Sequence, residues 1–122
     1  MKNRILPGII LSAFLLAGCQ QKTEDYIMTV QGPIPATEMG ITLSHEHVLV
    51  DFIGADSTGY HRWDRQQVMA RVLPFLKEIQ EYKVSTLIEC TPAYLGRDPW
   101  LLTELSNETG MHPVSYTHLR AH

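Results

Sequence analysis

The chain has 122 residues, of which 44% are hydrophobic and 19% are charged. That composition is typical of a folded protein and excludes disorder along the whole chain. The formal net charge is −3 and the Lys and Arg residues are scattered, which argues against a basic face that binds nucleic acid.

The first 25 residues have the pattern of an exported bacterial lipoprotein. Two basic residues precede an apolar run over residues 9–16, which is too short to cross a bilayer as a helix. The run leads into Leu16-Ala17-Gly18-Cys19, which resembles a lipobox, whose Cys is lipidated and becomes the new N-terminus. The sequence predicts a signal peptide over residues 1–18, lipid attachment at Cys19 and a polar tether over residues 19–25. We therefore expect an exported protein, anchored to a membrane on its periplasmic or cell-surface side. An ordinary signal peptide, with Cys19 a chance residue, is the alternative.

Strands come first in the segment that follows, residues 26–113. Residues 27–30 and 32–35 indicate a small β-hairpin, because a Gly-Pro turn separates two runs with β-branched residues. A strand over residues 41–43 leads into a pair of His residues. Residues 51–64 have the scattered Gly, Ser and aromatic residues of a long irregular loop.

A helix is predicted next, from its cap Asp64 to about Tyr82, with Pro74 expected to kink or split it. Its apolar positions recur at helical spacing and are Val68, Val72, Phe75, Leu76 and Ile79. A strand over residues 84–89 follows, then a helix capped by Asp98 and ended by Gly110, and a third strand opening at His112. Repeated βα units predict a parallel sheet with helices outside it, either open or closed into a barrel. The lack of a Gly-x-Gly-x-x-Gly pattern weakens the nucleotide-binding version.

The last nine residues, 114–122, resemble the translation of a transposon-end adapter used in sequencing libraries. We therefore expect them to be an artefact joined near Pro113, in which case His118 and His122 have no meaning as metal ligands. A genuine strand with an exposed tail is the alternative. A complete (β/α)8 barrel needs roughly 250 residues, so we expect the natural gene product to continue further.

His45 and His47 are the candidate metal ligands. Residues two apart on a strand project to the same face, so both imidazoles can face one ion while Glu46 points the other way. Imidazole nitrogen is a strong ligand for Zn²⁺ and neighbouring transition metals. The carboxyl end of a barrel strand is also where such folds build active sites. Spacing alone is weak evidence, because His-x-His recurs by chance.

The surrounding residues add a resemblance. The segment Gly40-Ile41-Thr42-Leu43-Ser44-His45-Glu46-His47 is similar to the first metal-binding strand of the phosphotriesterase family in the amidohydrolase superfamily. Residues 28–34 and the segment Gly96-Arg97-Asp98 resemble the same family, so the likeness covers nearly all of residues 26–112. It implies a (β/α)8 barrel, of which this chain holds a leading β-hairpin and the first two βα units. It also implies two metals, commonly zinc, bridged by a carboxylate from a later strand, with His45 and His47 binding one of them.

The function implied by the resemblance is metal-dependent hydrolysis of an ester bond in a small-molecule substrate, such as a phosphotriester or a lactone. The other metal ligands of the family fall on later strands, so we expect this chain alone to be inactive, and no catalytic residue is identified in it. The alternative is a non-catalytic, lipid-anchored barrel that only binds its ligand.

Several further residues have both a structural and a functional interpretation. Asp51 is predicted either to hydrogen-bond its loop or to orient a ligand His. Residues 61–63, His-Arg-Trp, lie in a loop of the kind that shapes substrate pockets, or have only a surface role. Glu89 ends a strand at the edge where barrel chemistry occurs. Cys90 is expected to be a small buried residue rather than a nucleophile, and no structural disulfide is predicted.

Overall fold

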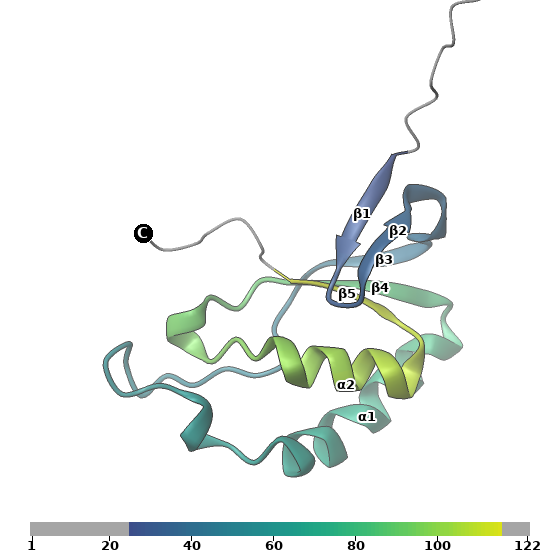
Figure 1. Ribbon diagram of the computed structural model, residues 1–122. Coiled ribbons are helices and arrows are strands. Elements are labelled where there is room, and N and C mark those ends of the chain that lie inside the picture. The colour runs from purple at the N-terminus through teal and green to yellow at the C-terminus, as the bar shows by residue number, and fades with distance from the viewer. Residues whose placement is uncertain (1–24, 116–122) are drawn as a thin grey trace, which may run out of the picture.

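A computed structural model describes residues 25–115 as a parallel sheet with helices on one face and a separate hairpin (Figure 1). The strands and helices, in chain order, are β1 (Tyr26–Thr29), β2 (Gly32–Pro35), β3 (Ile41–Glu46), α1 (Arg65–Glu81), β4 (Val84–Glu89), α2 (Pro99–Thr109) and β5 (His112–Ser115). Short 3-10 turns at Ala36–Glu38, Tyr60–Arg62 and Ala93–Leu95 lie in the connections. The predicted hairpin and the alternation of strands and helices after it are confirmed.

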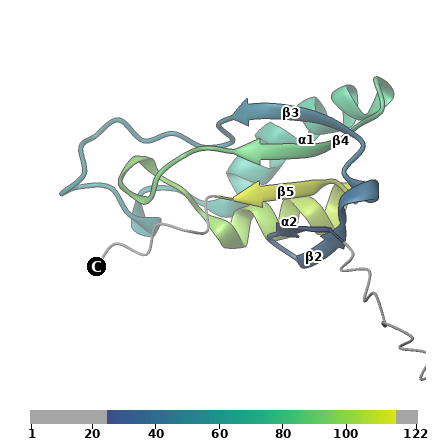
Figure 2. The ribbon, with the colours of Figure 1, turned by 90° about the horizontal axis from the view of Figure 1, so that it is seen from above.

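The parallel sheet has the order β3-β4-β5, so the carboxyl ends of its strands meet at one edge. Glu46, Glu89 and Ser115 are paired side by side at this carboxyl edge. Figure 2 shows the strands pointing the same way, with the connections that follow β3 and β4 extending past their carboxyl ends. Side chains from separate strands and loops are therefore brought together at this edge, as in other parallel α/β folds.

β3 and β4 pair with two compensating shifts in register, one between Ile41 and Thr42 and one between Leu43 and Glu46, where β3 has a local extra residue. Leu43 pairs with Leu87 and Glu46 pairs with Glu89, so three steps along β3 match two steps along β4. A bulge of this kind shifts the alternation of side chains between the two faces by one residue. Leu43 and Leu87 both pack into the core under the helices, so the register puts Glu46 on that side and His45 on the opposite face.

The hydrophobic core lies between the sheet and the two helices. Leu101 and Leu105 of α2 are each 1% exposed and pack with Leu87 of β4 and Leu76 of α1. Full burial of a Leu side chain contributes about 1.5–3 kcal/mol relative to leaving it exposed. The core is therefore centred beneath β4, and it holds both βα units in the arrangement that forms the carboxyl edge.

Two features of α1 refine the sequence interpretation. The helix is not split at Pro74 but runs unbroken from Arg65 to Glu81. Ala70, whose carbonyl loses its bond partner at Pro74, lies on the exposed side, where water can replace that bond. Phe75 is not a core residue: it is 54% exposed and lies beside the Arg71 guanidinium, 5.6 Å from the ring centroid.

The ends of the helices follow the predicted capping residues. The Asp64 carboxylate accepts a hydrogen bond from the backbone N–H of Gln67 at 3.0 Å, and Asp98 accepts from the first turn of α2. Gly110 ends α2 with φ of 70°, a left-handed conformation in which glycine has no Cβ to clash. These local signals give the boundaries of both helices.

Lys83 is the one non-glycine residue among residues 25–115 with a positive φ, 66°, just after the end of α1. The left-handed region is unfavourable for a residue with a Cβ, so Lys83→Gly is expected to raise the free energy of unfolding by about 0.5–1 kcal/mol. Denaturant unfolding of the whole protein measures this change. Lys77→Gly, in the exposed middle of α1, is the matched control and should lower stability by about 1 kcal/mol. Equal losses in both variants would contradict the assignment.

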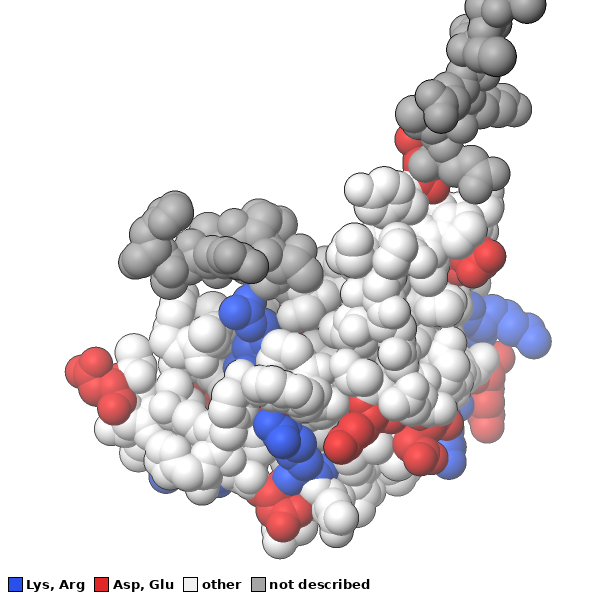
Figure 3. All heavy atoms as spheres, viewed as in Figure 1, with Lys and Arg blue, Asp and Glu red and all other residues white. Residues whose placement is uncertain are grey.

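The hairpin is tied to the rest of the fold beside β5. β1 and β2 pair antiparallel, with Ile27 opposite Ile34, and the backbone N–H of Val30 donates to the Pro113 carbonyl at 2.9 Å. On the face shown in Figure 3, acidic and basic side chains of the described residues are interspersed among uncharged ones. Neither helix in residues 25–115 has the length and apolar character needed to cross a membrane.

Candidate metal centre

His45 and His47 lie together at the carboxyl edge of the sheet. His45 is the penultimate residue of β3 and His47 follows its end. Both side chains are exposed, and their ring centroids are 5.1 Å apart with an angle of 73° between the ring planes. Two imidazoles bound through ring nitrogens to one tetrahedral zinc ion have centroids about 5 Å apart. The separation of the two rings is therefore compatible with a shared divalent ion.

The described residues supply a pair of ligands rather than a whole site. Within residues 25–115, no group of three or more His, Cys, Asp or Glu side chains is placed to hold a metal ion. A zinc site uses about four ligands. A metal held at His45 and His47 therefore needs further ligands from outside these residues.

A buried polar chain lies directly behind His47. Its Nδ1 atom is 3.0 Å from the Thr91 hydroxyl oxygen, which in turn is hydrogen-bonded to the Glu89 carboxylate. Glu89 is 2% exposed at the end of β4. Burial raises the pKa of the Glu89 carboxyl above its ordinary value, while hydrogen bonds from Thr91 lower it in part. Thr91 is the residue that the sequence interpretation missed, although its position two residues after a strand-ending Glu placed it at the same edge.

Asp51 organises the loop after β3. Its carboxylate accepts hydrogen bonds from the Arg62 guanidinium at 2.9 and 3.3 Å, from the Thr58 hydroxyl at 3.1 Å and from the Ile53 N–H at 3.3 Å. The Arg62 hydrogen bond is the largest influence that holds the pKa of Asp51 below its ordinary value. Of the two predicted roles, the observed contacts are those of loop bonding, and His47 is hydrogen-bonded to Thr91 instead.

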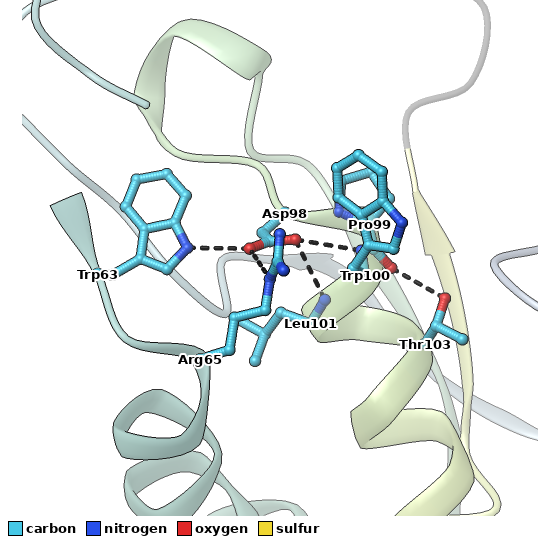
Figure 4. A network of polar contacts seen from close by, with 7 residues as sticks. All are labelled: Trp63, Arg65, Asp98, Pro99, Trp100, Leu101 and Thr103. Carbon is cyan, nitrogen blue, oxygen red and sulfur yellow. Dashed lines mark hydrogen bonds and ion pairs between the residues drawn. The ribbon is translucent and has the colours of Figure 1, made fainter. Parts of the chain in front are cut away.

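Asp98 joins the two helices and the loop between β3 and α1 (Figure 4). One carboxylate oxygen accepts from the backbone N–H groups of Trp100 and Leu101, and the other accepts from the Trp63 indole at 2.9 Å and from Arg65 at 2.7 Å. Burial raises the pKa of Asp98, but hydrogen bonds from Arg65 and Trp63 outweigh it and leave the pKa below its ordinary value. The predicted cap is confirmed, and Trp63 has a structural bond that the sequence did not reveal.

The remaining candidates lie around this edge. Glu46 lines an apolar groove of about 310 Å³ between β3 and α1, together with Leu43 and Phe75. His61 is exposed in the loop after β3. Cys90 is a free thiol and is half-buried, not buried as the sequence predicted. Its backbone N–H donates to the Glu46 carbonyl, which continues the strand pairing past β4 and leaves the side chain at the surface of the edge.

Two expectations concern residues outside 25–115. Cys19, with the signal peptide and most of its tether, precedes the described residues, and residues 116–122 follow them. Val114 and Ser115, the first two residues of the adapter-like segment, form the end of β5 and pair with Ile88 and Glu89. The origin of residues 114–122 stays a prediction.

Known proteins resemble this chain in sequence and in fold. A solved variant of the organophosphorus hydrolase of Deinococcus radiodurans is 27% identical with a TM-score of 0.67, over 75% of this chain and 28% of that one. Another solved structure of the organophosphorus hydrolase of Deinococcus radiodurans is 26% identical with a TM-score of 0.64, over 78% and 29%. A third structure comes from the engineering of organophosphate hydrolysis activity from a weak promiscuous lactonase template. It is 28% identical with a TM-score of 0.66, over 75% of this chain and 28% of that one.

This chain thus spans less than a third of the length of those solved relatives. Its parallel strands, outer helices and leading hairpin correspond to the first portion of a (β/α)8 barrel. The sequence model of the Phosphotriesterase family matches residues 25–120, most of the chain, including the His pair and the segment that caps α2. The chain therefore belongs to the phosphotriesterase family.

Proposed function

We propose that the whole protein is a metal-dependent hydrolase of ester bonds and that His45 and His47 hold one of two divalent ions, most simply zinc. The observation that carries this proposal is the pair of adjacent exposed imidazoles at the carboxyl edge, 5.1 Å apart, in a chain of the phosphotriesterase family. The separation and the softness of imidazole nitrogen suit Zn²⁺ and its transition-metal neighbours.

The described residues supply binding and orientation. His45 and His47 come from a strand end that is paired to β4, so the protein backbone fixes their spacing. The loop tied by Asp51 and Arg62 stands beside them at the edge where a substrate would enter. Divalent ions bound at such a centre polarise the scissile ester and lower the pKa of water, which provides a nucleophile at neutral pH.

The substrate proposal covers two ester classes, phosphotriesters and lactones. Solved relatives are described as organophosphorus hydrolases, and one is described as built on a lactonase template. The described loops at the carboxyl edge belong to the first two βα units. The rest of a barrel's substrate pocket would be built by later units, so both classes belong in the test.

Removal of bound metal is the direct test. The whole protein is purified, its metal content is measured by mass spectrometry, and hydrolysis of a phosphotriester and of a lactone is followed before and after dialysis against a chelator. We expect close to two divalent ions per chain, loss of hydrolysis on chelation and recovery when Zn²⁺ is returned, because the ions supply the chemistry.

Three results would contradict the proposal in different ways. Hydrolysis that continues undiminished in metal-free protein would rule out metal dependence. A metal-loaded protein that turns over neither ester, yet binds one of them, would favour the non-catalytic barrel. Hydrolysis of a different bond class with retained metals would overturn the ester assignment alone.

We further propose that the protein is exported and held at a membrane by lipid on Cys19. The support is the sequence Leu16-Ala17-Gly18-Cys19 after an apolar run, followed by a polar tether. The barrel portion begins directly after that tether, at β1. This placement would leave the carboxyl edge accessible to small esters on the extracytoplasmic side.

A further inference from the structure

The buried chain behind His47 constrains where protons can lie. The Thr91 hydroxyl donates its hydrogen bond to Glu89 Oε1, and the same oxygen atom of Thr91 lies 3.0 Å from His47 Nδ1. Thr91 is completely buried and Glu89 is 2% exposed, so neither group has bulk water as a competing partner. The Thr91 backbone N–H also donates to Glu89 Oε1, at 3.2 Å, which holds the carboxylate in place.

A hydroxyl group has one proton and can only accept once that proton is donated. Because the proton of Thr91 points to Glu89, the contact with His47 requires a proton on Nδ1 of the imidazole. Nε2 is then unprotonated and has a free lone pair. The hydrogen bond at one ring nitrogen thus decides which nitrogen is available as a ligand.

We propose that Thr91, held by Glu89, is a positioning residue that fixes His47 as the Nδ1–H tautomer and presents Nε2 to the metal. The inference rests on the proposed function for its purpose, although the tautomer itself is a property of the metal-free chain. Partners that hold the second nitrogen of a ligand His fix both its tautomer and its ring orientation. Here a hydroxyl links the imidazole to a carboxylate on the neighbouring strand, so β4 orients a ligand carried by β3.

The arrangement also accounts for a buried carboxylate that the site would otherwise leave without a role. Glu89 lies on the helix-covered side of the sheet with Leu87, in register with Glu46, and not among the exposed imidazoles. It therefore acts through Thr91 rather than on a substrate. Thr91→Val keeps the volume of the side chain and removes the hydroxyl, while Thr91→Ser restores the hydroxyl.

The test reads the tautomer directly. Nitrogen NMR of ¹⁵N-histidine-labelled whole protein, freed of metal at neutral pH, should give the Nδ1–H pattern for His47 in the wild type and in Thr91→Ser. Thr91→Val should lose that pattern. Zinc affinity, measured by competition with a chromogenic chelator, should fall about 10–100-fold in Thr91→Val and stay near the wild-type value in Thr91→Ser. Thr103→Val is the matched control, because the Thr103 hydroxyl bonds only the Pro99 carbonyl within α2.

The outcomes separate this inference from the proposed function. An Nε2–H pattern for His47 in the wild type overturns it, and that measurement needs no variant to fold. An unchanged tautomer and zinc affinity in Thr91→Val also overturn it. If the wild type binds no zinc and hydrolyses no ester, yet shows the Nδ1–H pattern that Thr91→Val loses, the proposed function fails while the positioning by Thr91 stands.

Discussion

Substituting Ala for either His45 or His47 is expected to weaken zinc binding by the whole protein about 10²–10³-fold. Structural zinc sites with four ligands bind with about 10–16 kcal/mol, so one ligand contributes about 2.5–4 kcal/mol. That free energy corresponds to two to three factors of ten in the dissociation constant, at about 1.4 kcal/mol per factor. Ester hydrolysis at limiting zinc should fall at least as far. The double substitution should leave one of the two metal positions empty at any practical concentration.

The measurement is zinc competition with a chelator, followed by hydrolysis at limiting and at saturating zinc. His112→Ala is the matched control, because His112 opens β5 at the opposite end of the sheet from the His pair. Its metal content and turnover should match the wild type. Equal zinc equivalents and equal turnover in the double variant and the wild type would remove His45 and His47 from the site.

Asp98→Ala is expected to lower the free energy of unfolding by about 3 kcal/mol. The carboxylate is fully buried and receives bonds from Trp63, Arg65 and the first turn of α2. Removing one partner of a buried ion pair costs about 3–5 kcal/mol, and loss of a helix cap about 1 kcal/mol. In the variant the Arg65 guanidinium still lies over two aromatic rings, 5.4 Å from the Tyr60 centroid and 5.2 Å from the Trp100 centroid. These contacts moderate the loss of stability.

Denaturant unfolding of the whole protein measures that loss, with Asp64→Ala as the control. Asp64 caps α1 from an exposed position, so its loss should cost only about 1 kcal/mol. The pH dependence gives a second check. The folded pKa of Asp98 is below its ordinary 3.8, so its charge stabilises the fold above that pH and loses this effect as the pH falls through the lowered pKa. The difference in free energy of unfolding between the wild type and Asp98→Asn should therefore shrink below pH 3.8. A constant difference, or equal losses in the two Ala variants, would contradict this assignment.

Local signals in the sequence predicted the elements well. Asp64 and Asp98 predicted the helix starts and Gly110 a helix end. Each of these signals depends on hydrogen bonds between residues that are close in the sequence, so a single sequence is enough to predict it. The hairpin was also predicted, although its turn is at Val30-Gln31 and the expected turn residues Gly32 and Pro33 begin β2. The adjacency of His45 and His47 was also predictable, because it depends on two neighbouring positions of one strand end.

Features that depend on contacts between distant segments were not predictable. Phe75 has the spacing of a core residue, but it lies beside β3, an edge strand in the described residues, so little covers it. Thr91 acquires its role only because parallel pairing brings the end of β4 beside His47, 44 residues earlier. Asp51 had two reasonable roles, and the placement of Arg62 across the loop selects one.

The local extra residue in β3 affects which side chains of this strand face the core and which face the opposite side. In a regular strand the odd-numbered positions Leu43 and His45 would share one side, and a single strand could not give Leu43 to the core and His45 to the opposite face. Three steps from Leu43 to Glu46 pair with two steps on β4, so one residue of β3 breaks the regular alternation of faces. The irregular register between Leu43 and Glu46 therefore allows Leu43 and His45 to lie on opposite faces. Deletion of Ser44 would make Leu43 and His45 neighbours in a regular strand, which would keep them on opposite faces without the bulge.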